Sequence, residues 1–124
     1  MIKMECKDTV DYGFNPCLPV SDGIPGITDL LNPKDIVVAD EEIQIEYDYP
    51  LSVSVRRSHR RKGGWTRIAL ARTIRKDYER IYWEEDRRPG KGPYGIWGHD
   101  IGDLVIEGAT YYKRTGIVRL SIGS

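Results

Sequence analysis

Hydrophobic and polar positions alternate in two neighbouring segments in the first half of the chain. Across residues 42–48 apolar residues stand between acidic or polar ones, and residues 51–56 repeat the pattern with serine and arginine. A period of two is typical of a half-buried strand, because successive side chains point to opposite faces. The apolar positions are Ile43, Ile45, Tyr47, Leu51, Val53 and Val55. We therefore predict two neighbouring strands, connected through Tyr49-Pro50.

The next periodic segment, residues 66–85, has the spacing of a helix. Its apolar residues recur every three or four positions, which places them on one face. They are Leu70, Ala71, Ile74, Tyr78, Ile81 and Tyr82. Thr66 is suited to be the N-cap, since its hydroxyl can accept a hydrogen bond from the first helical turn. The prolines and glycines of residues 87–93 end the pattern.

Strand patterns return after the helix. Residues 103–112 and 117–122 are rich in branched and aromatic residues, which have a high strand preference. Residues 113–116 separate them and are predicted to form a turn. By contrast residues 57–64, which precede the helix, are polar and basic, and we predict a loop there.

The order of these elements, strands then one long helix then strands, favours the α+β class. We predict a single domain over residues 36–124, in which an antiparallel sheet from residues 36–57 and 103–123 packs against one long amphipathic helix. Residues 1–35 differ, because four prolines interrupt regular structure every few residues. They are predicted to form an extended Pro/Gly-rich arm. Its apolar residues favour docking, on its own domain or on a neighbour.

The composition is that of a globular protein. The 124 residues are 40% hydrophobic and 31% charged, with no net charge. No apolar run is long enough to span a bilayer, and the first residues lack the apolar core of a signal peptide. We therefore expect a cytoplasmic protein without membrane contact. In that compartment Cys6 and Cys17 are expected to be free thiols rather than a disulfide.

Charge is distributed unevenly along this neutral chain. Residues 1–51 contain 3 basic and 11 acidic residues, whereas residues 56–76 contain 9 basic residues and no acidic one. Such a basic block needs an external anion, the acidic part of its own chain or of a neighbouring subunit, or solvent. The candidate partner-binding residues are Arg56, Arg57, Arg60, Arg61, Lys62 and Trp65. Arginine offers paired donors to a carboxylate or a phosphate, and tryptophan can stack on a base.

A second candidate site is the glycine-rich segment 94–104. It contains Trp97, His99, Asp100 and Asp103. A histidine beside an aspartate occurs in divalent-metal hydrolases, but a metal needs further ligands, and the other histidine, His59, stands among basic residues. We favour a structural loop, in which glycines allow tight turns, Trp97 enters the core and Asp100 holds the backbone. The alternative is a metal-dependent hydrolase around His99 and Asp100.

Two stretches of the chain carry a resemblance to known sequences. One is residues 64–86, and the other is YGIWGHDIGDL at residues 94–104. Together they resemble a core segment of uncharacterised proteins of plants and large DNA viruses, over roughly residues 36–124. The resemblance implies a shared fold unit and no particular activity. The arm at residues 1–35 lies outside it.

The motifs of nucleotide-binding enzymes and serine hydrolases do not occur in the chain, so no cofactor and no small-molecule substrate are expected. The leading hypothesis is a non-enzymatic protein-interaction or structural module, as a component of a larger assembly. Its partner would be an acidic protein surface or another copy of itself. The alternative is a nucleic-acid-binding protein that uses the basic segment 56–76, and the hydrolase is the second alternative.

Overall fold

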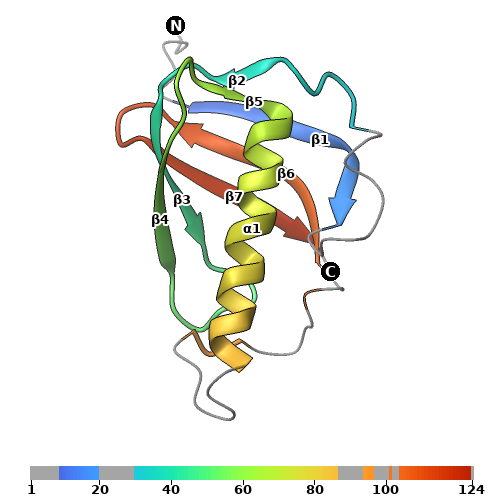
Figure 1. Cartoon of the computed structure of the whole chain (residues 1–124), viewed down its shortest axis with the longest axis vertical. Coiled ribbons are helices and arrows are strands. Elements are labelled where there is room, and N and C mark those ends of the chain that lie inside the picture. The colour runs from blue at the N-terminus through green and yellow to red at the C-terminus, as the bar shows by residue number, and fades with distance from the viewer. Residues whose placement is uncertain (1–8, 20–29, 87–93, 97–100, 102–103, 124) are drawn as a thin grey trace, which may run out of the picture.

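The computed structural model describes residues 9–19, 30–86, 94–96, 101 and 104–123, the first of these ranges by its backbone alone. Figure 1 shows how the elements are arranged. They are β1 (Thr9–Pro19), β2 (Ile36–Val38), β3 (Glu42–Tyr47), β4 (Val55–Arg60), β5 (Trp65–Thr66), α1 (Arg67–Asp86), β6 (Val105–Tyr112) and β7 (Ile117–Gly123). The one helix and the mostly antiparallel strands of the described residues confirm the α+β class.

Among the described residues five strands form one sheet in the order β1-β6-β7-β3-β4, and β2 pairs with β5 separately. The expectation of a wholly antiparallel sheet is wrong at one junction, because β3 and β7 pair in parallel, with Ile45 opposite Val118. The direction of β7 depends on where the chain returns after α1, which local periodicity does not record. Residues 9–19, within the segment expected to be an arm, pair with β6 at one margin of the sheet.

The second predicted strand lies further along the chain than expected. The alternating segment 51–56 contributes only its last two residues, and β4 instead occupies Val55–Arg60, most of which was expected to be a loop. Its side chains alternate between half-buried and exposed positions, although several of them are arginines. A long arginine side chain can cover apolar surface with its methylene stem and keep its charge in water, so this strand lacks an apolar alternation in its sequence.

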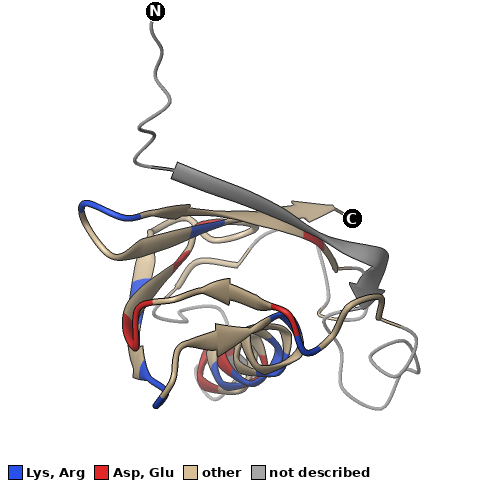
Figure 2. Ribbon diagram, turned by 90° about the horizontal axis from the view of Figure 1, so that it is seen from above, with Lys and Arg blue, Asp and Glu red and all other residues tan. Residues whose placement is uncertain are grey.

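The helix begins where the sequence indicates. The backbone N–H of Ala69 donates to Thr66 Oγ1 at 3.2 Å, which satisfies one of the free donors of the first turn. Figure 2 views α1 end-on, with the sheet on one side of it. The rings of Tyr47 in β3 and Tyr78 in α1 meet edge to face, 5.0 Å apart between centroids. Buried side chains from α1 join those of the strands in one core: Ile45, Tyr47, Leu70, Ile74, Tyr78, Ile81, Ile106 and Val118.

The turn between β4 and β5 depends on two glycines with positive φ. Replacing each of them is expected to lower the free energy of unfolding by a different amount. A Cβ at Gly64 (φ 92°) would lie 2.7 Å from the backbone oxygen of Val38, whereas one at Gly63 (φ 85°) meets no atom within 4 Å. We expect Gly63→Ala to cost about 1 kcal/mol of unfolding free energy, from backbone strain alone. Gly64→Ala should cost about 2–3 kcal/mol, since the chain of β2 must also move. Urea unfolding of both variants measures the difference, and equal costs would contradict it.

Candidate protein-interaction surface

Of the strands that the structure describes, β4 is the last one of the sheet on the side opposite β1, and it carries three of the candidate partner-binding residues. Arg56, Ser58 and Arg60 are exposed on the face of the sheet away from α1. Val55, Arg57 and His59 are half-buried on the side of α1. The strand therefore presents its basic side chains to two different environments, and these need separate descriptions.

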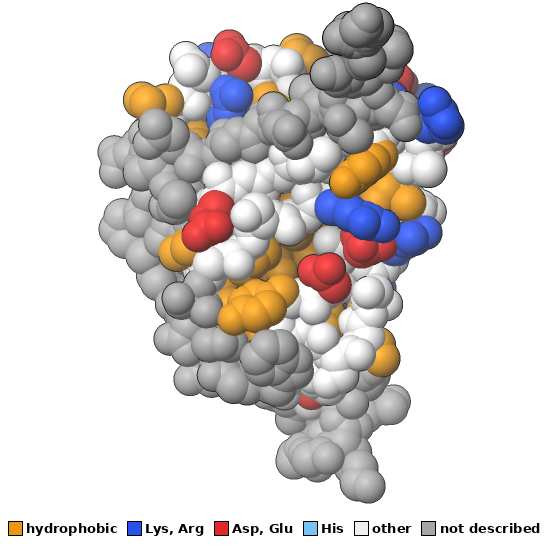
Figure 3. Space-filling view, turned by 180° about the vertical axis from the view of Figure 1, so that it is seen from behind, with side chains coloured by type: hydrophobic (Ala, Val, Ile, Leu, Met, Phe, Trp, Pro, Cys, Tyr) orange, Lys and Arg blue, Asp and Glu red, His pale blue; other side chains and the backbone are white. Residues whose placement is uncertain are grey.

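On the exposed face a row of alternating charge crosses three strands. Glu46 of β3 accepts from Arg119 of β7 at 3.3 Å and from Arg56 of β4 at 3.1 Å. The guanidinium of Arg119 also lies over the ring of Tyr112 in β6, 5.4 Å from its centroid. Figure 3 shows this side of the molecule, where basic and acidic side chains lie next to hydrophobic ones. The row reads positive, negative, positive and ends at Arg56, whose side chain is 50% exposed.

A second row of charged side chains lies at the other end of β3 and β4. Arg60 contacts Glu42 and Glu41 at 3.3 Å each, and its side chain is 67% exposed. Between the rows Gln44 Nε2 donates to Ser58 Oγ at 3.4 Å. Exposed ion pairs of this kind contribute roughly 0–1 kcal/mol each, because water screens them. Arg56 and Arg60 are thus oriented by their acidic neighbours and are still accessible to another carboxylate.

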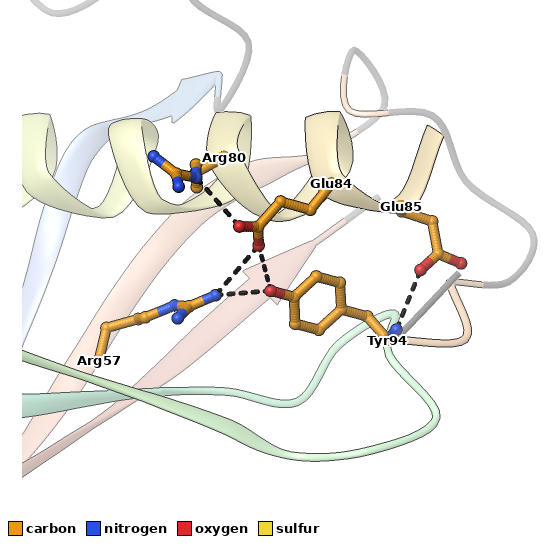
Figure 4. Close-up of polar contacts among 5 residues, drawn as sticks. All are labelled: Arg57, Arg80, Glu84, Glu85 and Tyr94. Atoms are coloured by element: carbon orange, nitrogen blue, oxygen red, sulfur yellow. Dashed lines mark hydrogen bonds and ion pairs between the residues drawn. The ribbon is translucent and has the colours of Figure 1, made fainter. Parts of the chain in front are cut away.

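Arg57 differs from Arg56 and Arg60, because its guanidinium is bound by other side chains of the protein (Figure 4). Its Nη2 donates to the Tyr94 hydroxyl at 2.6 Å and lies 3.4 Å from Glu84 Oε1. The Tyr94 hydroxyl donates to the same carboxylate, and Arg80 Nε donates to its other oxygen at 3.1 Å. The hydrogen bond from Tyr94 lowers the pKa of Glu84, while burial and then the Glu84 carboxylate raise the pKa of Tyr94. This network ties β4 to the end of α1.

The beginning of the glycine-rich segment is anchored at the same end of α1. The Glu85 carboxylate accepts from the backbone N–H groups of Tyr94 and Ile96, at 3.0 Å each. Four residues of the predicted structural loop lie outside the described residues: Trp97, His99, Asp100 and Asp103. Their role, in a structural loop or in a hydrolase, stays a prediction.

The remaining candidate residues lie in the turn after β4 and at the start of β5. Arg61 Nη1 donates to the Gly64 carbonyl at 2.7 Å, and Lys62 is exposed. Trp65 is only 3% exposed, and its Nε1–H donates to the Glu41 carbonyl at 3.0 Å. Its ring is part of the core and does not contribute to the exposed surface. Among the candidate residues Arg56, Arg60 and Lys62 are therefore accessible. The others are held by the fold: Arg57, Arg61 and Trp65.

Sequence reasoning missed one cluster of polar side chains behind β4. Asp77 Oδ2 of α1 accepts from the Tyr47 hydroxyl at 2.5 Å and lies 2.7 Å from His59 Nε2, which places the ring proton on Nε2. Tyr47 is fully buried, and burial followed by the charge of Asp77 raises its pKa well above the usual value. A signal was present in the sequence, since Asp77 directly precedes Tyr78 and borders the apolar face of the predicted helix. The cluster connects β3, β4 and α1.

The described residues include no group of three or more His, Cys, Asp or Glu side chains that could hold a metal ion. A depression of about 580 Å³ opens on the exposed face, between β3, β4 and the turn that contains Thr115 and Gly116. Glu42, Gln44 and Arg60 line it, so it is polar, unlike the mostly apolar pockets that enclose small molecules. It extends the accessible surface of β4 across β3.

Comparisons of the chain with protein-family models, with curated proteins and with solved structures find no match in any of the three. Among the described residues no helix is long and apolar enough to cross a membrane.

Proposed function

We propose that this protein is a non-enzymatic interaction module that binds an acidic protein partner at the exposed face of β4. One observation carries the proposal. The rows of alternating charge across the sheet end at the edge strand with Arg56 and Arg60, each of which has its acidic neighbours on one side only. A partner that supplies carboxylates on the open side would extend both rows. Electrostatic complementarity of this kind selects a partner and speeds its association.

The distribution of the other basic residues favours a protein partner over a nucleic acid. A nucleic-acid surface needs many arginines and lysines directed at phosphates on one face. Here Arg57 is held by Glu84 and Tyr94, and Arg67 donates to the Asn32 carbonyl at 2.8 Å. Arg75 is only 5% exposed. Much of the basic segment 56–76 is thus engaged within the protein, which leaves a small basic surface suited to a few carboxylates.

The test is a binding titration with fluorescently labelled acidic peptides, and with a labelled single-stranded oligonucleotide in a parallel series. The double variant Arg56→Ala/Arg60→Ala should weaken binding of a peptide with alternating glutamates about tenfold, since two ion pairs contribute together about 1.4 kcal/mol. The matched control is Arg72→Ala/Lys76→Ala, which removes the same charge from two exposed positions of α1.

Equal losses in the two double variants would contradict the proposal, because they would indicate attraction by net charge alone. Tighter binding of the oligonucleotide than of every acidic peptide, with a steep dependence on salt, would replace the proposal with the nucleic-acid alternative.

A further inference from the structure

We infer that the partner binds as an additional strand, pairing antiparallel with β4 through its main chain. This inference rests on the proposed function and adds the mode of binding and the pattern of sequence that the partner must have. It uses three observations: the unpaired backbone groups of β4, the positions of its arginines, and the charge that opposes pairing of β4 with a second copy.

The hydrogen bonds of β3 show which backbone groups of β4 face outward. Gln44 N–H donates to the Gly116 carbonyl, so even-numbered residues of β3 direct their backbone groups toward β7. Its odd-numbered residues therefore face β4, where Ile45 stands opposite Arg57. Arg61 N–H, which donates to the Glu41 carbonyl, continues the same parity. It follows that Arg57 and its odd-numbered neighbours pair with β3.

The even-numbered residues of β4 consequently direct their N–H and C=O groups away from the sheet. They are Arg56, Ser58 and Arg60, and no backbone hydrogen bond joins them to any other described residue. Figure 1 shows β4 on the left side of the molecule, where the turn between β6 and β7 reaches further out, and no described strand pairs with the outer edge of β4. Such a row of free donors and acceptors is the template that extended peptides use when they add a strand to a sheet.

The side chains of the same residues set the sequence of the added strand. Arg56 and Arg60 are four residues apart and point to one face, with Ser58 between them. Side chains of neighbouring strands stand directly opposite one another on each face, and opposite charges there are stabilising. The added strand would therefore place two carboxylates four residues apart, with a small polar residue midway. It would extend the rows that already contain Glu46 and Glu42.

The same geometry disfavours a second copy of the protein as the occupant. Antiparallel pairing of β4 with another β4, centred on Ser58, would place Arg56 of each copy opposite Arg60 of the other. Directly opposed like charges destabilise a strand pair, and charged residues commonly protect sheet edges from self-association. The partner is thus an acidic extended segment of a different protein.

The experiment uses the full chain and short synthetic peptides. The parent peptide carries two glutamates four residues apart with a threonine midway and valines between them. A control peptide has the same composition, with one glutamate moved by a single position, so that the two carboxylates fall on opposite faces. Two further peptides are methylated on the backbone nitrogen, one at the amides that would pair with β4 and one at the amides that would face away.

We expect the parent peptide to bind, and the displaced glutamate and the methylated pairing amides each to weaken binding about tenfold or more. Methylation of the outward amides should leave the affinity within about twofold. Ser58→Pro should also abolish binding, since it removes an outward donor and no bond to β3. Amide exchange supplies an independent readout: the N–H groups of Arg56, Ser58 and Arg60 exchange quickly in the free protein and slowly in the complex.

Three outcomes would overturn the inference, and they differ from one another. If acidic peptides bind without sensitivity to backbone methylation and without new amide protection, the mode of binding is wrong and the proposed function stands. If no acidic peptide binds at all, the proposed function fails as well. If the protein alone is a dimer by light scattering, with the same three amides already protected, the occupant is a second copy.

Discussion

Stability is expected to fall steeply above pH 10, because buried tyrosines keep their protons in the folded protein. Burial, as the largest cause, raises the pKa of both Tyr47 and Tyr78 well above the usual value of 10.0. Burial and the nearby Asp40 carboxylate raise the pKa of Tyr111 to about 12. Below pH 10 these phenols are protonated in both states, so their contribution is constant. Above it the unfolded chain loses protons that the folded protein retains, and unfolding becomes more favourable.

The size of this effect follows from proton linkage. Each such tyrosine removes about 1.4 kcal/mol of unfolding free energy per pH unit while only the unfolded form is ionised. Three tyrosines together would remove about 3 kcal/mol between pH 10 and pH 11, because an unfolded phenol is already half ionised at pH 10. This loss is a large fraction of the roughly 5–15 kcal/mol that stabilises most domains. Urea unfolding at neutral pH, at pH 10 and at about pH 11 measures the loss.

A matched variant assigns the effect to a particular residue. Tyr78→Phe loses the hydrogen bond from the Tyr78 hydroxyl to the Tyr49 carbonyl, which is 2.7 Å long, and is expected to be about 1 kcal/mol less stable at neutral pH. Its loss of stability between pH 10 and pH 11 should be smaller by about 1 kcal/mol. An unchanged slope would show that Tyr78 ionises normally in the folded protein, contrary to the prediction.

Asp77→Ala is expected to cost about 3–4 kcal/mol of unfolding free energy. The carboxylate accepts from Tyr47 and His59, and hydrogen bonds to a charged group contribute roughly 1.5–3 kcal/mol each. Its loss leaves the buried Tyr47 hydroxyl without its acceptor, and an unsatisfied buried donor is itself costly. It also separates β4 from α1 at the point where His59 is held. Chemical denaturation of the purified variant provides the measurement.

A double-mutant cycle distinguishes the polar cluster from general damage to the core. Tyr47→Phe removes only the hydroxyl. In the Asp77→Ala background, where that hydroxyl has lost its acceptor, the same change should be neutral or slightly stabilising. In the native background it should be destabilising by about 1–2 kcal/mol. If Tyr47→Phe costs the same in both backgrounds, the two residues are not coupled and the description of the cluster is wrong.

Asp77→Ala also bears on the proposed surface, because the cluster lies directly behind β4. His59 belongs to the half-buried side of the strand, while the arginines that would contact the partner lie on the other side. The variant should therefore speed amide exchange at His59 N–H, which pairs with Ile43 of β3. Slow exchange there in the variant would show that pairing with β3 alone positions the strand.

The candidate surface was foreseen in part from the sequence. Its basic residues were recognisable, because no acidic residue interrupts the segment 56–76. The sequence does not indicate which of these residues are exposed and which are engaged within the protein. Arg56 faces water, whereas Arg57, the next residue, faces Glu84 and Tyr94. This difference depends on the pleat of β4, and the pleat is visible only once the strand is located. Residues 97–100 of the glycine-rich segment, which include His99, lie outside the described residues, so their role stays a prediction.

The elements that local interactions specify can be recognised from the sequence alone. Thr66 supplies the N-cap of α1, and the prolines and glycines of residues 87–93 follow its end. The alternation across residues 42–48 specifies β3, because one face of that strand is apolar. These features lie within a few residues of one another, and their spacing alone identifies the helix and the strand.

Relations between segments that are distant in the sequence depend on tertiary packing. The register of β4 comes from pairing with β3, because its arginines and histidine show no apolar alternation. The parallel contact of β3 with β7 depends on how the chain returns after α1. The bonds from Tyr47 and His59 to Asp77 join residues 30 and 18 positions apart. Periodicity indicates which face of an element is buried. It does not indicate which element covers that face, or which edge of a sheet stays unpaired.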